Sequence, residues 1–250
     1  MLAYASWVST SNMNDNSCGT SCMRNYVAFM PMPVVAKQCN DLLFPADQRM
    51  IRNDFTTRLY VSPPSVDSGC DEIFTMIIYD KNDNVNGHHE VITAASQSTI
   101  DLTDKSEMAS SSYSGQIPMY RLGSILNYPD SLTAYGHFAH IVPSIQEWVT
   151  GKTQFYTLAK NCYIEFYADQ DGVDPDLIKV DGIALSNYDY DLNRMHYFNR
   201  RYGHFILELP GYGLHTLENG GNYVLYVICK NVNGAYDAAG YLTGYNQRKQ

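Results

Sequence analysis

The sequence is poor in charge and lacks an apolar run long enough to cross a membrane. Charged residues make up 17% of the 250 residues, against about a quarter in a typical globular protein. The most apolar stretch, residues 26–36, is too short for a bilayer and contains Pro31 and Pro33. A surface with few charges keeps molecules apart poorly, so the composition favours self-association, with a modestly soluble monomer as the alternative. We expect no membrane partner.

Positive charge is the scarcer kind. The chain has 17 Lys and Arg against 26 Asp and Glu, a formal net charge of −9 and a pI of about 5.1. Recognition of a phosphate backbone needs clustered Lys and Arg, and the basic clusters are only the pairs at 200–201 and 248–249. Each pair is more typical of a solvated turn or tail than of a phosphate site. Sequence-specific nucleic acid is therefore not an expected partner.

Motifs of known chemistry are incomplete. The Gly-Lys-Thr at 151–153 lacks the earlier glycine of a phosphate loop. The loop 80–87 has calcium-loop spacing but offers Asn where carboxylates are needed, and Thr93 stands where a bidentate Glu is required. His88 and His89 would point to opposite faces of a strand. We expect no catalytic residue, no metal site and no required cofactor, although a Cys/His or Ser/His pair brought together by the fold stays open.

The cysteines predict a reduced chain. An even number permits disulfides, which a chain of this length does not need. Cys162 and Cys229 lie in apolar, strand-like runs and are predicted to be buried thiols. Cys18, Cys22 and Cys39 could hold zinc or form a disulfide, and their spacing does not choose between these. The first ten residues carry no Lys or Arg and only a short apolar stretch, so no secretory signal is predicted and we expect an intracellular protein.

Strand patterns dominate the chain. Residues 202–209 and 222–229 are rich in β-branched and aromatic residues, and a Pro-Gly turn closes the first run. Residues 161–167 alternate in a way that predicts a strand with one buried face, formed by Cys162, Ile164 and Phe166. Further strands are predicted at 72–79, 89–95, 132–142 and 177–185, with an Asn86-Gly87 hairpin turn between the first two and an extended edge segment at 26–36.

Two helices are also predicted. In residues 45–59 a proline suits the first position, and Ile51, Phe55 and Leu59 recur at i, i+4 and i+8. Ser144 and Glu147 have the spacing of a capping box for a short helix through residue 149 that stops near residue 151. The polar stretches 96–114, 169–176 and 187–199 are predicted to be loops or turns.

These elements predict one mainly β domain. We expect a single-domain antiparallel β-sandwich, jelly-roll-like and decorated with a few α-helices, over residues 23–250. Residues 1–22 are rich in Ser, Thr and Asn and are predicted to form an N-terminal arm.

The stretch Arg201-Tyr-Gly-His-Phe-Ile-Leu-Glu-Leu-Pro-Gly-Tyr212 resembles a run in cypovirus polyhedrins, the proteins of insect-virus occlusion crystals. Those chains carry Tyr-x-His-aromatic leading to Glu-Leu-Pro and a further Tyr, and they are similar in length, tyrosine content and polar C-terminal tail. The resemblance implies a β-sandwich, trimers that build a lattice around virus particles, a clamping N-terminal helix and bound nucleotides. Here the arm 1–22 is not helix-like, and no nucleotide contact matches residue by residue.

The expected function is therefore structural. The chain would self-assemble into crystalline viral occlusion bodies in the cytoplasm of the infected host cell, protecting virions and dissolving at alkaline pH as phenols and thiols ionise. Tyrosine suits packing interfaces because it brings a large ring and a hydroxyl at low entropic cost. The residues expected at assembly contacts are Tyr188, Tyr190, Tyr202, Tyr212 and Tyr245.

Two other classes of function stay open. The first is a ligand- or glycan-binding or capsid-type module that uses the loops 80–87 and 187–199, with Tyr188, Tyr190 and Tyr197 as stacking platforms. The second is a hydrolase that uses Cys162, Cys229 or His204.

Overall fold

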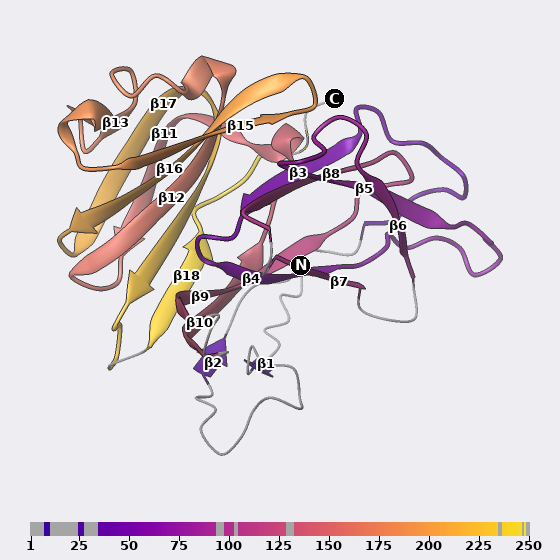
Figure 1. Ribbon diagram of the computed structural model, residues 1–250, viewed down its shortest axis with the longest axis horizontal. Helices are drawn as coiled ribbons and strands as arrows, with labels where there is room; N and C mark the ends of the chain where they lie inside the picture. The colour runs from indigo at the N-terminus through magenta and orange to yellow at the C-terminus, as the bar shows by residue number, and fades with distance from the viewer. Residues whose placement is uncertain are drawn as a thin grey trace.

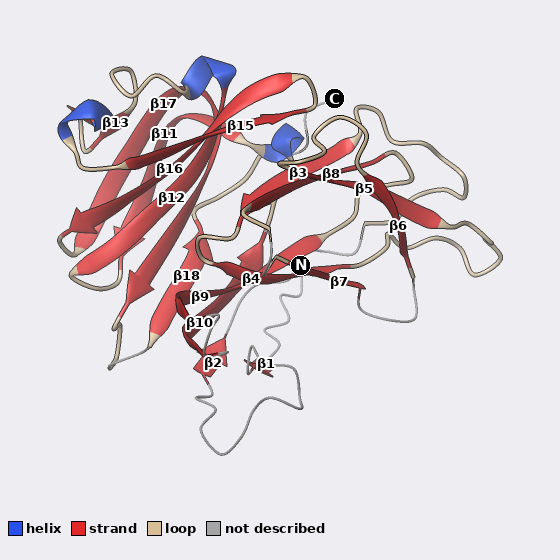
Figure 2. Cartoon of the chain, in the orientation of Figure 1, coloured by secondary structure: helices blue, strands red, loops and turns tan. Residues whose placement is uncertain are grey.

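Antiparallel β-sheet is the dominant regular structure of the described residues, which confirms the mainly β prediction and is consistent with a β-sandwich (Figure 2). The computed structural model describes residues 8–10, 25–27, 35–93, 98–102, 105–128, 133–234, 237–246 and 248. Most of the predicted arm, with Cys18 and Cys22, and much of the predicted edge segment lie outside these residues. No helix in the described ranges is long and apolar enough to cross a membrane.

The N-terminal lobe contains two four-stranded sheets, which lie on the right and at the centre of Figure 1. One sheet has the order β3 (Asp47–Arg52), β8 (Glu107–Ser112), β5 (Phe74–Asp80) and β6 (His88–Ile92). The other has the order β10 (Thr133–Ile141), β9 (Met119–Tyr128), β4 (Thr56–Val61) and β7 (Ser98–Asp101). A separate pair joins β1 (Val8–Thr10) to β2 (Asn25–Val27).

The C-terminal half forms one eight-stranded sheet, on the left of Figure 1. Its strands are β11 (Val149–Thr157), β12 (Asn161–Asp169), β13 (Lys179–Val180), β14 (Ile183–Ala184), β15 (Asp191–Tyr197), β16 (Arg200–Pro210), β17 (Gly213–Lys230) and β18 (Ala238–Leu242). Three single-turn 3-10 helices accompany them: η2 (Ile145–Glu147), η3 (Gln170–Gly172) and η4 (Leu185–Asn187).

The long strand β17 organises this sheet. Its first half pairs with β11 and β13, and its second half pairs with β12 and β18. The helix η3 contacts the part of β17 that lies between the residues pairing with β13 and those pairing with β12. There the Asn219 side-chain amide donates to the Gly172 carbonyl, and the Asn222 backbone N–H donates to the Asp169 carboxylate. The remaining neighbours, β16 and β15, extend the sheet beyond β12.

The large sheet is buried on both faces. Cys162, Ile164 and Phe166 point into a core that lies wholly within the C-terminal half, as the alternation predicts. Glu165 and Tyr167 on the opposite face are also fully buried, because that face packs against the N-terminal lobe. The prediction of one buried face on this strand was therefore wrong, since a sheet between two layers has no solvated side.

The predicted helix 45–59 is wrong, since β3 and β4 occupy it as two strands. The side chains of Asp47 and Arg49 form a buried ion pair at 3.1 Å. Residues two apart share a face on a strand but lie on nearly opposite sides of a helix, so this pair favours the strand. A turn at Asn53, whose carbonyl accepts from Thr56 at 3.3 Å, separates the strands. Pairing with β8 and β9 overrides the helical spacing of the apolar residues.

Two predicted loops contain strands. Within 96–114 the chain forms β7 and β8, and β8 is buried along its whole length although Ser fills three of its positions. Its hydroxyls are satisfied, as when Ser112 donates to the Thr75 carbonyl at 2.8 Å, so small polar residues can be buried there. Within 187–199 the chain forms the edge strand β15, whose Met195 and Tyr197 are buried.

The predictions of the second helix and of the strand at 177–185 were also wrong in extent. The Ser144 N–H donates to the Glu147 carboxylate at 2.8 Å, as a capping box requires, but the helix is the single turn η2 and β11 follows at once. Residues 177–185 form the two short strands β13 and β14, joined by a turn in which Asp181 and Gly182 have φ of 51° and 80°. An Asp-Gly pair at positive φ is a strong hairpin signal.

The other strand predictions are confirmed. β5, β6, β10, β12, β16 and β17 overlap the strands predicted at 72–79, 89–95, 132–142, 161–167, 202–209 and 222–229, with ends that differ by a few residues apart from the earlier start of β17. The Asn86-Gly87 turn joins β5 to β6 with Gly87 at φ +64°. The Pro-Gly turn at Pro210 and Gly211 joins β16 to β17.

Cys162 and Cys229 are buried as predicted, but they form a disulfide, so the prediction that they are free thiols was wrong. The two residues are directly opposite on the neighbouring strands β12 and β17, with Cα atoms 4.1 Å apart, so the strand register brings their side chains together. Cys39 and Cys70 form a second disulfide, so neither zinc nor a pairing with Cys22 explains Cys39. No free cysteine occurs among the described residues.

Candidate functional site

The most strongly perturbed ionisable groups lie between the two lobes. Arg121 on β9 contacts Glu165 on β12 through a 2.5 Å ion pair, and both side chains are fully buried. The Glu165 carboxylate also accepts hydrogen bonds from the Tyr167 hydroxyl and from Nε2 of His204, each at 2.9 Å. Burial alone would raise the pKa of Glu165, but the Arg121 charge and the His204 hydrogen bond outweigh it and lower that pKa to about 2.

Aromatic rings complete this cluster. The guanidinium carbon of Arg121 lies 5.5 Å from the ring centres of both Phe138 and Tyr226, a favourable cation–π arrangement in a dry site. The ring of His140 stacks on Tyr226 at 4.5 Å. Burial and the nearby Arg121 lower the pKa of His140 to about 3, so this imidazole is neutral at physiological pH. Its Nδ1 then donates to the Ile141 carbonyl.

The charge cluster is inaccessible. Arg121, Glu165 and His204 have no exposed surface, and neither of the two clefts described below includes them. A general acid or base must come within hydrogen-bond reach of a substrate, which this packing prevents. The cluster therefore acts as an ionic link between the N-terminal sheets and the large sheet.

The cysteine–histidine hydrolase has no support in this geometry. Cys162 and Cys229 are bridged and fully buried, whereas a nucleophile requires an accessible thiolate. Both side chains point into the C-terminal core, and His204 lies on the opposite face of the sheet beside Glu165. These residues thus do not meet.

The residues expected at assembly contacts are scattered. Tyr202 is 2% exposed and packs edge-on against Trp148 at 5.9 Å, so most of its side chain is covered within the fold. Tyr188 and Tyr190 are half-buried against the C-terminal core. Tyr245 and Tyr212 are exposed, at 44% and 69%. Tyr197, expected as a stacking platform, is also buried.

Tyr212 belongs to an exposed apolar cluster, which we call the turn patch: Tyr156, Leu158, Tyr212 and Leu214. Tyr156 on β11 is directly opposite Leu214 on β17, and the rings of Tyr156 and Tyr212 are 5.9 Å apart. The four side chains are between 40% and 69% exposed. Lys160 lies beside them in an exposed position, and its carbonyl accepts from the Gly211 N–H at 2.8 Å. The Pro-Gly turn thus presents these side chains at one end of the large sheet.

A second set of exposed apolar side chains, the disulfide patch, comprises Leu42, Phe44, Ile73 and Tyr113 in the N-terminal lobe. Their segments are joined by the Cys39–Cys70 bridge and by a backbone hydrogen bond from Leu43 to Tyr113. The rings of Phe44 and Tyr113 are 5.4 Å apart, and the four side chains are between 46% and 70% exposed. The patch lies beside a cleft of about 350 Å³ whose lining includes Asp41 and Leu42.

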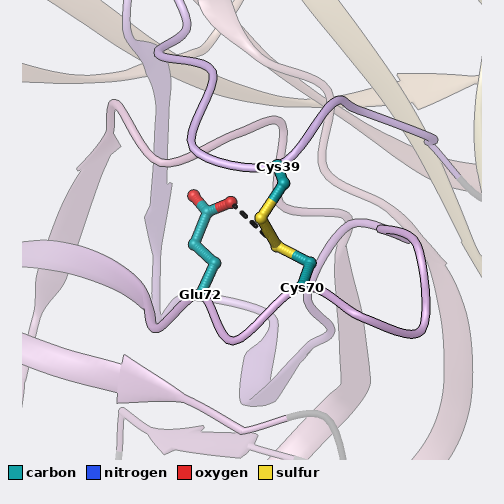
Figure 3. Close-up of side chains that lie close together, drawn as sticks. All are labelled: Cys39, Cys70 and Glu72. Atoms are coloured by element: carbon teal, nitrogen blue, oxygen red, sulfur yellow. Dashed lines mark hydrogen bonds between the residues drawn. A yellow bond between two sulfur atoms is a disulfide. The ribbon is translucent and has the colours of Figure 1, made fainter.

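The Cys39–Cys70 disulfide ties together the segments that carry this patch (Figure 3). Glu72 extends toward the bridge, with an oxygen 3.9 Å from the Cys70 sulfur. The bridged sulfur carries no proton, so we interpret this as a close contact and not as a hydrogen bond. Glu72 accepts instead from Lys37 at 2.5 Å and from the Asn40 N–H at 2.8 Å. The grouping of two Cys and a Glu is thus a structural staple in this oxidised form.

A basic cleft of about 1100 Å³ lies between η3 and the β15–β16 hairpin. It is lined by Gln170, Asp171, Val173, Arg194, Met195, His196, Asn199, Arg200, Arg201 and Tyr202. Sequence reasoning assigned the Arg200-Arg201 pair to a solvated turn, since it could not know that β15 would bring Arg194 and His196 alongside.

Comparisons with known proteins add little to this geometry. No family model matches the chain, and no curated protein matches it. Among solved structures, a lectin from Pleurotus ostreatus in complex with GalNAc shows 9% sequence identity, covering 84% of this chain and 86% of that one, with a TM-score of 0.19. A TM-score this low supports no inference about fold or ligand.

Proposed function

We propose that this protein is a non-catalytic structural module that associates with further copies of itself, joining the turn patch of one copy to the disulfide patch of the next. The main observation that supports this proposal is the turn patch, in which four apolar side chains, Tyr212 among them, are exposed together. Exposed apolar clusters on a soluble protein are typical of interaction sites, and tyrosine is enriched in such interfaces.

A second copy is the proposed partner because the two patches complement each other. Lys160 borders the turn patch, while the exposed carboxylates of Asp41 and Asp71 border the disulfide patch. Glu72 does not add to this acidic rim, since Lys37 pairs with it. Opposite charges around apolar centres favour docking of one surface on the other.

The position of the patches determines the form of the assembly. The turn patch belongs to the large sheet and the disulfide patch to the N-terminal lobe, which lie on opposite sides of the view in Figure 1. A contact between two different patches is heterologous, and such contacts produce rings or open chains. Growth without closure is also what the occlusion-body matrix implied by the resemblance would need.

The disulfides bear on where such a module would work. Protein disulfides persist in oxidising compartments and are rare in the cytosol, and this chain has two bridges among its described residues. We therefore propose an oxidising setting in place of the reduced cytoplasm that the sequence predicted. The four bridged sulfurs do not titrate, so they would not contribute to a dissolution by alkali, whereas tyrosine would.

Sedimentation velocity over a wide concentration range tests the proposal. The unmodified chain should show a mass that rises with concentration, and a Tyr212→Glu/Leu214→Glu variant should stay at 28.2 kDa. A matched control, Leu177→Glu, changes a side chain that is 69% exposed outside both patches and should associate normally. A monodisperse monomer for the unmodified chain at every concentration would contradict the proposal.

The crystalline form of the proposal has its own test. Expression in insect cells should give intracellular micrometre-scale particles if the chain is an occlusion-body matrix. Discrete soluble oligomers in those cells would support the association and contradict the crystalline matrix.

A further inference from the structure

The basic cleft concentrates positive charge in an acidic protein. Arg194, Arg200 and Arg201 line it together with His196, and Asp171 is the single carboxylate among the lining residues. The whole chain has a formal net charge of −9. None of the three arginines forms an ion pair with any residue that the structure describes. No carboxylate of the described residues therefore neutralises these three charges, and an anionic ligand could do so.

The sheet register aligns these groups. His196 is directly opposite Arg201, and Arg194 is opposite Gly203, so the two arginines and the imidazole share one face of the hairpin. A Cβ at Gly203 would lie 2.8 Å from the Phe205 ring and 3.1 Å from the Val173 side chain. The glycine therefore allows the segment after η3 to pack against β16, which forms one wall of the cleft.

The hairpin tip is held in a strained conformation. Phe198 and Asn199 have φ of 56° and 58°, which is unusual for an aromatic residue. The Phe198 ring packs edge-on against Tyr79 at 5.5 Å, and the Asn84 amide donates to the His196 carbonyl at 2.9 Å. Contacts with the N-terminal lobe thus fix the arginine-bearing hairpin, and backbone strain of this kind often occurs at binding sites.

We propose that this cleft binds a sulfated oligosaccharide. A guanidinium presents paired N–H donors that match the oxygens of a sulfate group, and the side-chain amides of Gln170 and Asn199 offer partners for sugar hydroxyls. The volume of about 1100 Å³ is at the upper end of ligand pockets and leaves room for an oligosaccharide. A long nucleic acid would need an extended basic surface, whereas the rest of this chain is acidic. A sulfated sugar also fits the oxidising setting proposed above from the two disulfides, and the cleft shares no residue with either apolar patch.

Isothermal titration calorimetry at one fixed salt concentration tests this. The probes are a heparin-derived tetrasaccharide, its desulfated counterpart and a single-stranded oligonucleotide of equal formal charge. The sulfated sugar should bind, the desulfated sugar should not, and the oligonucleotide should bind at least tenfold more weakly. Failure of the sulfated sugar to bind, equal binding of the desulfated one, or tighter binding of the oligonucleotide would each overturn the proposal.

Variants assign the binding to the cleft. Arg194→Gln and Arg201→Gln should each weaken binding about tenfold or more, because a hydrogen bond to a charged group is lost. Arg201→Lys should fall between Arg201→Gln and the unmodified chain, since it keeps the charge but not the planar fork. Lys179→Gln removes an exposed charge elsewhere on the same sheet and should leave binding unchanged. Unchanged affinity in both glutamine variants, with melting temperatures intact, would refute the assignment.

Discussion

Breaking the buried ion pair between Arg121 and Glu165 should strongly destabilise the fold. Arg121→Met removes the positive partner and leaves a carboxylate that has no exposed surface. Removing one partner of a buried pair costs about 3–5 kcal/mol, out of a total stability of about 5–15 kcal/mol. For a chain of this size each kcal/mol shifts the melting temperature by about 2–4 °C, so we expect a decrease of roughly 6–20 °C.

A double-mutant cycle separates the pair from its surroundings. Glu165→Gln keeps a group that can accept from Tyr167 and His204 but removes the charge. The double variant Arg121→Met/Glu165→Gln buries no uncompensated charge, so it should cost less than the sum of the two single changes, with a coupling of about 0.5–3 kcal/mol. Urea unfolding followed by far-UV circular dichroism measures each free energy.

A half-exposed ion pair provides the control. Lys105 lies 3.7 Å from Asp80, with side chains 32% and 25% exposed, and Lys105→Met should cost at most about 1 kcal/mol. If Arg121→Met cost no more than this control, the charge cluster would not hold the two lobes together.

The same cluster predicts sensitivity to acid. The folded-state pKa of Glu165 is about 2, below its usual value of 4.5, so the folded state releases this proton more readily than the unfolded state. Its contribution is complete above pH 4.5 and is lost as pH falls toward 2, amounting to roughly 3 kcal/mol at 1.36 kcal/mol per pKa unit. Glu165→Gln should flatten the stability profile in this range. An identical acid profile in the two proteins would contradict this assignment.

Three further outcomes follow from other contacts. Mild reductant should open the exposed Cys39–Cys70 bridge before the buried Cys162–Cys229 bridge, and its opening should lower the free energy of unfolding by about 2–4 kcal/mol. Mass spectrometry after alkylation would show the order of opening, and earlier opening of the buried bridge would refute the prediction. The Tyr241 hydroxyl accepts from the Tyr156 N–H at 2.8 Å and donates to the Tyr156 carbonyl at 2.6 Å. Tyr241→Phe should therefore speed hydrogen exchange of the Tyr156 amide, and an unchanged exchange rate would show that the Tyr241 hydroxyl does not protect it. A hydrogen bond with Tyr212 raises the pKa of Tyr156, so association should persist up to about pH 10 and disappear above it as phenolates repel, whereas dissociation by pH 8 would exclude tyrosine as the switch.

Strands with strong side-chain alternation were predictable from the sequence. The runs that became β12, β16 and β17 carry β-branched and aromatic residues at the spacing of a pleated sheet, and the Asn86-Gly87 turn set one hairpin. The serine-rich β8 was missed because its burial depends on partner strands β3 and β5, which no local pattern shows. The Asp181-Gly182 turn was a local signal that could have divided the strand predicted at 177–185.

The candidate surfaces were less predictable than the fold. Tyr202 and Tyr212 were both expected at contacts because of their residue type, but Tyr212 is exposed and Tyr202 is buried. The basic cleft forms because the pairing of β15 with β16 brings Arg194 near Arg201. The prediction of residues 187–199 as a loop gave no sign of this pairing. Disulfide pairing likewise depends on strand register, which brings Cys162 opposite Cys229.

Mixing two association-deficient variants tests the head-to-tail contact most directly. Tyr212→Glu/Leu214→Glu disables the turn patch, and Phe44→Glu/Tyr113→Glu disables the disulfide patch. Each variant alone should be monomeric at 28.2 kDa. An equimolar mixture should form a dimer of twice that mass and nothing larger, because each variant keeps one intact patch that fits the other. If the mixture stayed monomeric, or if only one variant lost association on its own, the two patches would not be partners and the central claim would be contradicted.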